Sequence, residues 1–266
     1  MSNFSTKMAS FFKNAASRTL RYIGIAAIIY ASAVFYLALT ERRNAFPRAI
    51  YHKEANEAIQ NRAQKLTCLL QDGIILNGFS LGKEGAPVLL YFPEADEDAA
   101  QFLAQIDTLP GINVVTFNYR GSAQNKGTPS EENFESDGKS IVDCATQVNK
   151  TEPKYLIGRG IGAILAAKEA KQGQKVIFID PVFDIAEAIS QKYGVLYPKF
   201  LVRTNFKADL DKFSADFAHV NVIFDKKINE NKVKEAIEPL KKKNVTNRSG
   251  GPLAPLLLQE INKNLF

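Results

Sequence analysis

Histidine and cysteine are scarce in this 266-residue chain, and tryptophan is absent. The histidines are His52 and His219, and the cysteines are Cys68 and Cys144. None of them has the spacing of a zinc-ligand pair, so no metal site is expected, and no motif implies a cofactor. Cys68 falls in a predicted strand and Cys144 in a predicted helix, which favours two buried structural thiols.

The shortage of histidine also limits acid–base catalysis. His52 lies shortly after an apolar N-terminal run, and His219 lies at the N-terminal end of a predicted strand. Active sites in open α/β sheets form at the carboxyl ends of the strands. Neither histidine is therefore expected to serve as the general base of a nucleophilic enzyme.

The chain has 28 acidic residues and 34 lysines and arginines, which leaves a net charge of +6. Part of this excess lies beside the apolar N-terminal run, and Lys241-Lys242-Lys243 is interpreted as a solvated helix end. No basic patch is interleaved with aromatic residues. The charge therefore fits an anionic membrane surface better than a nucleic acid, and no nucleic-acid partner is expected.

One stretch, Tyr22–Leu39, has 18 residues and no charge. About 20 apolar residues span a bilayer, so the stretch predicts a single transmembrane helix that anchors the chain in the membrane. A signal peptide cleaved at Ala31-Ser32-Ala33 and a buried core helix are the alternatives. The side of the membrane stays open because Arg42, Arg43 and Arg48 balance the basic residues upstream.

The sequence divides into a basic segment at 1–21, a transmembrane helix at 22–39, a juxtamembrane linker or helix at 40–64 and a globular domain at 65–266. Apolar runs predict strands over 66–70, 74–79, 88–92, 114–119, 155–157, 176–179 and 220–224 and near 245. Helices are predicted over 96–109, 131–148, 163–171 and 253–264, after Asp180-Pro181, and after 224. A hairpin followed by repeated strand–helix units predicts a doubly wound, mostly parallel α/β sheet with an N-terminal antiparallel hairpin.

Residues Gly158-Arg159-Gly160-Ile161-Gly162 connect a predicted strand to a helix of small residues. This is the outline of a G-x-S-x-G nucleophile elbow, in which flanking glycines let a strand turn sharply into a helix. The central residue is Gly160, which has no side chain to attack a carbonyl. We expect Gly160 at positive φ on a tight turn at the carboxyl edge of the sheet. A phosphate-binding glycine turn is the rival interpretation. Such turns belong to the first strand–helix unit of a dinucleotide-binding fold, whereas residues 158–162 follow a late strand.

Two further segments carry a family resemblance. Residues 117–122 (FNYRGS) and 127–132 (GTPSEE) closely resemble the D-Y-R-G…G-x-P-S-E-E block of the membrane-anchored, serine-aminopeptidase-like branch of the α/β hydrolases. Gly158 follows at the distance of that family's elbow, and Asp180-Pro181-Val182-Phe183 resembles its S-P-F segment. The resemblance extends from Leu66 to the C-terminus and implies an α/β-hydrolase fold with a serine–acid–histidine triad.

The residues at the triad positions implied by this resemblance are not catalytic ones. Gly160 occupies the nucleophile position and Ile228 the acid position, with Asp225 as a shifted alternative. The stretch that would carry the histidine contains Gly251 and no imidazole. The family's H-G-N oxyanion loop aligns with Pro93-Glu94-Ala95, where the Glu94 carboxylate has the wrong sign to stabilise an oxyanion.

These substitutions predict a membrane-anchored pseudoenzyme that binds an unidentified ligand or protein partner at the rim of the former active site. The rim would consist of Pro93, Glu94, Arg120, Gly121, Ser122, Arg159, Gly160, Ile161 and Asp180. Arg120 and Arg159 have the chemistry to bind an anion, although the resemblance implies a structural role for both.

Two alternatives stay open. The first is a serine hydrolase, an esterase or acyl hydrolase, with a relocated nucleophile. Ser122 and Ser249 are the candidates, and Lys126 would have to act as the base of Ser122 in the absence of histidine. The second is a purely structural membrane protein whose soluble domain only assembles with other proteins.

Overall fold

The structure, a computed structural model, describes residues 2–46, 48–106, 109–210, 219–224, 237–240 and 244–249, and residues 255, 257, 259 and 261. Its described residues form an eight-stranded sheet in the order β1-β2-β4-β3-β5-β6-β7-β8. The strands are β1 (Gln64–Leu69), β2 (Ile75–Leu81), β3 (Val88–Phe92), β4 (Asn113–Phe117), β5 (Tyr155–Arg159), β6 (Lys175–Ile179), β7 (His219–Phe224) and β8 (Asn244–Ser249).

The N-terminal hairpin is antiparallel and the rest of the sheet is parallel. β1 pairs antiparallel with β2, and β2 pairs antiparallel with β4. From β4 through β3, β5, β6 and β7 to β8, every neighbouring pair is parallel. The predicted turn closes the hairpin: Gly73 has φ +82°, and the Leu70 N–H donates to the Ile74 carbonyl at 2.8 Å. The predicted mixed α/β sheet is confirmed.

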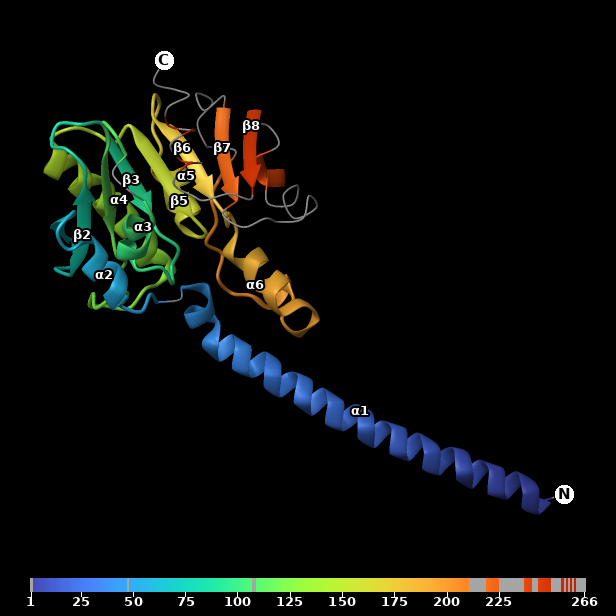
Figure 1. Cartoon of the computed structure of the whole chain (residues 1–266). Helices are drawn as coiled ribbons and strands as arrows, with labels where there is room; N and C mark the ends of the chain where they lie inside the picture. Colours follow the sequence, from blue (N-terminus) through green and yellow to red (C-terminus); the bar gives the residue numbers. More distant parts are fainter. Residues whose placement is uncertain are drawn as a thin grey trace.

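Helices cover both faces of the sheet (Figure 1). The helical elements are α2 (Lys53–Ile59), α3 (Ala99–Gln105), α4 (Glu131–Asn149), α5 (Gly162–Glu169) and α6 (Ile185–Tyr193), with the 3-10 turns η1 (Gly194–Leu196), η2 (Lys199–Leu201) and η3 (Glu238–Leu240). α4 and α5 pack on one face, against residues such as Leu90. α2, α3, Leu257 and Ile261 pack on the other face, against residues such as Leu89. Because successive strand residues point to opposite faces, β3 is buried on both sides.

Some element boundaries differ from those predicted. The helix expected over 96–109 is shorter, because Asp98 caps α3. The Asp98 carboxylate accepts from the Ala100 N–H, and Gln101 completes a capping box with it. The helices expected after 224 and over 253–264 lie mostly outside the described residues.

The two cysteines form a disulfide, so the interpretation of Cys68 and Cys144 as separate thiols is wrong. Their Cα atoms are 5.7 Å apart although 76 positions separate them in the sequence. Cys68 lies on the face of β1 that α4 covers, and Cys144 belongs to α4. Only the packing of this helix on this strand brings the two sulfur atoms together.

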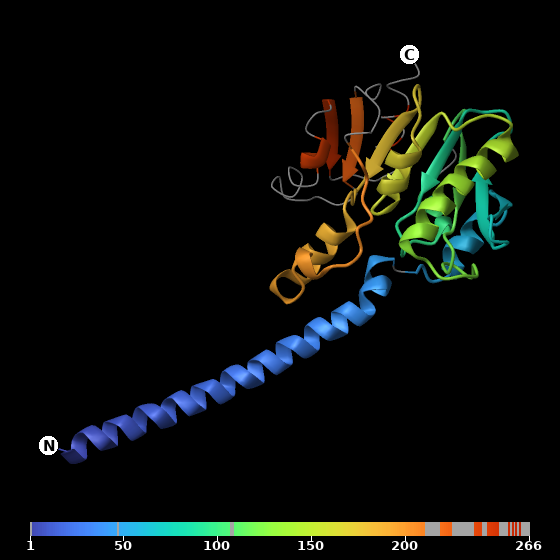
Figure 2. The same cartoon turned by 180° about the vertical axis from the view of Figure 1, so that it is seen from behind.

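The N-terminal segment is one continuous helix, α1 (Ser2–Ala45). It includes the predicted basic segment, the predicted transmembrane stretch and the start of the predicted linker, whose remainder contains α2. Within it, Ala15–Ala45 is long enough and apolar enough to cross a membrane, since it contains an 18-residue window with a mean hydropathy of 2.1. This stretch is mostly exposed, and α1 projects away from the sheet in both views (Figures 1 and 2). Such a helix suits a membrane anchor or a signal sequence, and not the core helix of a globular domain.

Candidate functional site

The elbow has the geometry predicted for it. β5 ends at Arg159 and α5 begins at Gly162, which leaves two residues for the turn. Gly160 has φ +51°, and its N–H donates to the Ile179 carbonyl at 3.0 Å, at the carboxyl edge of the neighbouring strand β6. A Cβ on Gly158 would overlap the backbone of α5, so the strand and helix approach closely only because that side chain is missing.

The Glu94 side chain fills the space beside this turn. Its Oε1 atom accepts hydrogen bonds from the Ala95 N–H at 3.0 Å and from the Ile161 N–H at 3.4 Å. Ile161 follows the nucleophile position and Ala95 lies in the loop after β3. In a G-x-S-x-G hydrolase, N–H groups at these two places form the oxyanion hole. The sequence placed the Glu94 carboxylate in the loop that would stabilise an oxyanion, and in the structure this carboxylate itself accepts from the two N–H groups at those places.

Glu94 and a nucleophile at position 160 exclude each other. A Cβ built on Gly160 would coincide with the Glu94 Oε2 atom. A serine at 160 would therefore have to displace the carboxylate before its hydroxyl could lie where the fold presents a nucleophile. Gly160 thus serves two purposes: it adopts positive φ without strain, and it leaves room for Glu94.

A second buried carboxylate fixes the loop that carries Glu94. The Glu97 Oε2 atom accepts from the Tyr91 hydroxyl at 2.6 Å and from the Glu94 N–H at 3.1 Å. Its Oε1 atom accepts from Arg159 Nη1 at 3.2 Å. The Tyr119 hydroxyl donates to the Pro93 carbonyl at 2.9 Å. Arg159 therefore forms an ion pair within the site, in line with the structural role that the resemblance implied.

Burial governs the protonation of these two carboxyl groups. Burial raises the pKa of Glu94, the neighbouring Asp96 and Glu97 carboxylates add to that rise, and the two N–H donors oppose it, which leaves the pKa at about 7. Burial also raises the pKa of Glu97, while the Arg159 guanidinium opposes that rise. Glu94 therefore changes between its neutral and charged forms near neutral pH.

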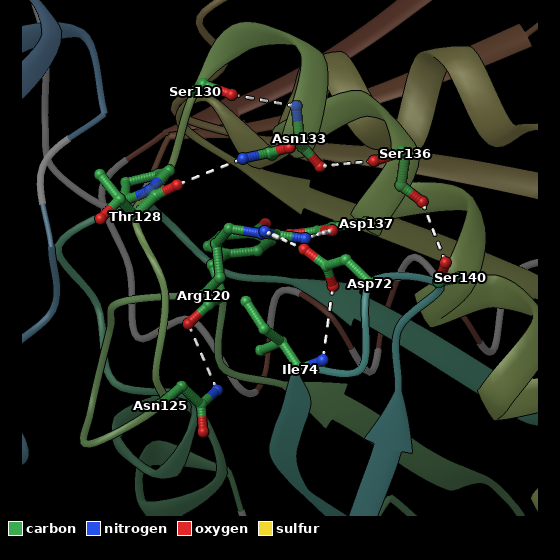
Figure 3. A network of polar contacts seen from close by, with 12 residues as sticks. Asp72, Ile74, Arg120, Asn125, Thr128, Ser130, Asn133, Ser136, Asp137 and Ser140 are labelled. Atoms are coloured by element: carbon green, nitrogen blue, oxygen red, sulfur yellow. Dashed lines mark hydrogen bonds and ion pairs between the residues drawn. The ribbon is translucent and has the colours of Figure 1, made fainter.

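Arg120 lies inside the protein and supports the fold. Its Nε and Nη2 atoms donate to the two Asp137 carboxylate oxygens at 2.6 Å each, and Nη1 donates to Asp72 at 2.7 Å (Figure 3). These contacts join the hairpin turn, the loop after β4 and α4. Its donors are directed at Asp72 and Asp137, so Arg120 is placed to stabilise the fold rather than to bind an anion at the rim.

The candidate relocated nucleophiles are placed as follows. Ser122 is buried, and its Oγ atom accepts from the Ala49 N–H at 3.1 Å, which fastens the segment after α1 to the loop after β4. Lys126 is exposed, and its carbonyl accepts from the Gly121 N–H. Ser249 is the last residue of β8, level with Phe224, and its side chain lies outside the described part of the structure.

The remaining rim residues differ in exposure. Pro93, Gly160 and Ile161 are buried, whereas Glu94, Gly121, Arg159 and Asp180 are partly exposed. Asp180 follows β6 with φ +43°, and its N–H donates to the Ile223 carbonyl. The predicted acid position, Ile228 or Asp225, and the predicted histidine position, Gly251, lie outside the described residues.

Neither histidine is at the elbow. The His52 Nδ1 atom accepts from the Ala55 N–H at 3.3 Å and caps α2. His219 begins β7, four residues before Ile223, which is level with the end of β6. At about 3.3 Å per residue, its backbone lies roughly 13 Å from that edge.

Comparison with known proteins identifies the fold. No protein-family model matches the chain. It is 22% identical over 216 residues to an uncharacterized protein of Mycobacterium tuberculosis (strain H37Rv), over 77% of this chain and 76% of that protein. It resembles the crystal structure of an α/β hydrolase from Vibrio vulnificus, with a TM-score of 0.66 and 18% identity over 84% of this chain and 91% of that one.

A second structural relative is the esterase Pf2001 of Pyrococcus furiosus, with a TM-score of 0.59 and 14% identity over 82% of this chain and 94% of that one. The chain therefore has the α/β-hydrolase fold.

Proposed function

We propose that this chain is a membrane-anchored pseudoenzyme of the serine-aminopeptidase-like branch of the α/β hydrolases. It would bind a ligand or a protein partner at the rim of the former active site. The observation that carries the proposal is the Glu94 carboxylate, which accepts from the Ala95 and Ile161 N–H groups in the place of an oxyanion.

Acyl transfer by this fold needs a nucleophile, a base and a free oxyanion hole. Position 160 supplies no nucleophile, and Glu94 fills the oxyanion hole with its own carboxylate. His52 caps α2, and His219 begins β7 at the opposite end from the elbow. Among the described residues, position 160 thus lacks a nucleophile, the oxyanion hole is filled and neither histidine is at the elbow. This supports a binding role, because a fold can be kept after its catalytic activity is lost.

The first experiment tests the absence of hydrolysis. The full chain, solubilised in detergent, is incubated with a fluorophosphonate probe and with p-nitrophenyl acetate, with Ser122→Ala and Glu94→Gln as matched variants. We expect no labelling and no turnover above buffer in any of the three. Turnover that is lost in Ser122→Ala would favour the relocated-nucleophile enzyme, and turnover that is lost in Glu94→Gln would make Glu94 catalytic.

The second experiment tests binding at the rim. A ligand that binds the folded state alone raises the melting temperature. A thermal-shift screen of small molecules on the full chain is repeated with Asp180→Asn, which removes a rim charge at φ +43° while keeping a residue that tolerates this conformation. A ligand that stabilises the wild type much more than the variant supports a rim site. Equal shifts for every ligand found would place binding elsewhere.

The anchor is tested separately. Sodium carbonate should leave the full chain in the membrane pellet, because α1 exposes an apolar stretch long enough to cross the bilayer. A chain that begins at Tyr51 should remain in the supernatant. Release of the intact chain by carbonate, or a mature protein that lacks residues 22–33, would contradict the anchor.

A further inference from the structure

An apolar tip projects from the domain beside α1. The segment Gly194–Leu201, which contains η1 and η2 and is called the cap tip below, exposes three large apolar side chains. Val195 is 89% exposed, Phe200 is 83% exposed and Leu196 is 49% exposed. Exposed aliphatic and aromatic residues on one short segment indicate a surface that contacts a membrane or another protein.

A buried carboxylate fixes the cap tip to α1. Glu41, on α1, is 4% exposed and accepts hydrogen bonds from the Tyr197 hydroxyl at 2.6 Å and the Arg203 N–H at 2.9 Å. The Thr204 N–H donates to the same carboxylate at 2.6 Å. A buried charge with this many donors holds its surroundings in one arrangement. α1 and the cap tip are therefore expected to move as one body.

A second contact lies farther toward the N-terminus of α1. The Tyr30 hydroxyl donates to the Val195 carbonyl at 3.3 Å. Tyr30 lies within the uncharged stretch Tyr22–Leu39, nine residues before Leu39. At about 1.5 Å per residue, it is roughly 13 Å along the helix from the end of that stretch. If α1 crosses a bilayer at this stretch, Val195 lies beside the middle of the span.

Charged residues lie on α6 and in the cap tip, and their positions relative to the exposed apolar side chains bear on membrane contact. Lys199 forms ion pairs with Asp184 at 3.0 Å and Glu187 at 2.9 Å, near the beginning of α6 and close to the sheet. Lys192, next to the tip, is exposed and has a stem long enough to reach the headgroup region. Figure 1 shows α6 projecting from the sheet on the same side as α1. Lys199 itself belongs to the cap tip, and its ion pairs direct its ammonium group toward the beginning of α6.

We propose that the cap tip is a second membrane-contact site, in which Val195, Leu196 and Phe200 insert into the lipid leaflet that surrounds the C-terminal half of the α1 span. This inference rests on the proposed anchor. α6 begins five residues after the rim residue Asp180, so insertion of the tip would fix the height of the rim above the bilayer.

The absence of tryptophan makes a direct test available. A single tryptophan is introduced into the full chain as Val195→Trp or Phe200→Trp, and each protein is reconstituted into phosphatidylcholine vesicles. Ile29→Trp, on an exposed face of α1, shows the signal of a tryptophan within the membrane span. Leu69→Trp, exposed on β1, shows the signal of a tryptophan in water. The measurements are the emission maximum and the quenching by phosphatidylcholine with brominated acyl chains.

We expect Val195→Trp and Phe200→Trp to emit at shorter wavelength than Leu69→Trp and to be quenched at least half as strongly as Ile29→Trp. Both positions are exposed, so neither substitution disturbs the core. Quenching of Ile29→Trp without quenching of either cap-tip tryptophan would overturn the inference and leave the anchor intact. Absence of quenching at all four positions would contradict the anchor itself.

Discussion

At the scale of single residues, Gly160 and Glu94 form one unit. The glycine leaves the space that the carboxylate fills, and the carboxylate satisfies N–H groups that would otherwise face an empty site. Each residue alone looks like a substitution in a degenerate site. Together they form a closed arrangement, in which the Glu94 carboxylate accepts from the N–H groups at the two places that form the oxyanion hole of a G-x-S-x-G hydrolase.

This coupling predicts a non-additive pair of substitutions. Gly160→Ser should destabilise the wild type by about 2–4 kcal/mol, because a Cβ at φ +51° is strained and also displaces Glu94. In a Glu94→Ala background the same change should cost only about 1–2 kcal/mol, from backbone strain alone. Denaturant melts of the four proteins in detergent measure this cycle. Equal costs in the two backgrounds would show that Glu94 does not occupy the site.

The protonation of Glu94 predicts a dependence of stability on pH. The folded protein keeps this proton up to about pH 7, whereas an unfolded chain releases it near pH 4.3. The folded state therefore binds more protons between these values, and the contribution of Glu94 to the free energy of unfolding falls as pH rises through this window. Glu94→Gln keeps an acceptor for both N–H groups and cannot ionise.

We therefore expect Glu94→Gln to match the wild type in stability near pH 4. The variant should gain up to roughly 3 kcal/mol over the wild type by pH 8, at about 1.36 kcal/mol per pKa unit. Denaturant unfolding at a series of pH values gives the difference directly. A difference that does not change with pH would mean that the carboxyl group ionises normally in the folded state.

Sequence reasoning named both residues of this pair but not the contact between them. The glycines at 158, 160 and 162 predicted the tight turn and its positive φ, because few other residues fit such a turn. The direction of the Glu94 side chain was not predictable. It depends on two N–H groups 66 positions apart, Ala95 and Ile161, that only the parallel pairing of β3 and β5 brings together.

At the scale of elements, local patterns predicted the strands well because each strand is a short apolar run between turns. β3 agrees with its predicted bounds, and β6 begins one residue earlier than predicted. Contacts between elements were harder to predict from the sequence. The Asn118 side-chain amide, for example, accepts from the Ala99 N–H at 2.7 Å and donates to Asp98 at 3.1 Å. An aspartate at position 118 would place a second carboxylate against Asp98, and the two charges would repel each other. The asparagine amide avoids this repulsion.

The disulfide is the contact between elements with the largest expected effect on stability. Cys68→Ala or Cys144→Ala should each lower the free energy of unfolding by about 2–4 kcal/mol, because the bridge closes a loop of 76 positions. The double variant should lose little more than either single variant. Unfolding of the oxidised chain with and without reductant provides a matched control. A stability that reductant leaves unchanged would contradict a structural role for the bridge.

At the scale of the whole molecule, the disulfide bears on the question that the basic residues left open. Arg42, Arg43 and Arg48 balance the basic residues before Tyr22, so the positive-inside rule does not orient α1. Structural disulfides form and persist in oxidising compartments and are rare in a reducing cytosol. With the apolar stretch of α1 between them, the sheet domain and residues 1–21 lie on opposite sides of the bilayer if α1 is the anchor.

The expected topology therefore places residues 1–21 in the cytoplasm and the sheet domain in an oxidising compartment, where the cap tip would meet the leaflet that faces this compartment. In intact cells, acid trapping followed by denaturation and maleimide labelling should modify Cys68 and Cys144 only after reduction. Protease added from outside, or to the interior of the oxidising compartment, should remove the domain and leave a protected N-terminal fragment. Free thiols in trapped cells, together with a domain that resists this protease, would reverse the orientation. The cap tip would then contact the cytoplasmic leaflet, since its position beside Tyr30 is set by α1 and not by the compartment.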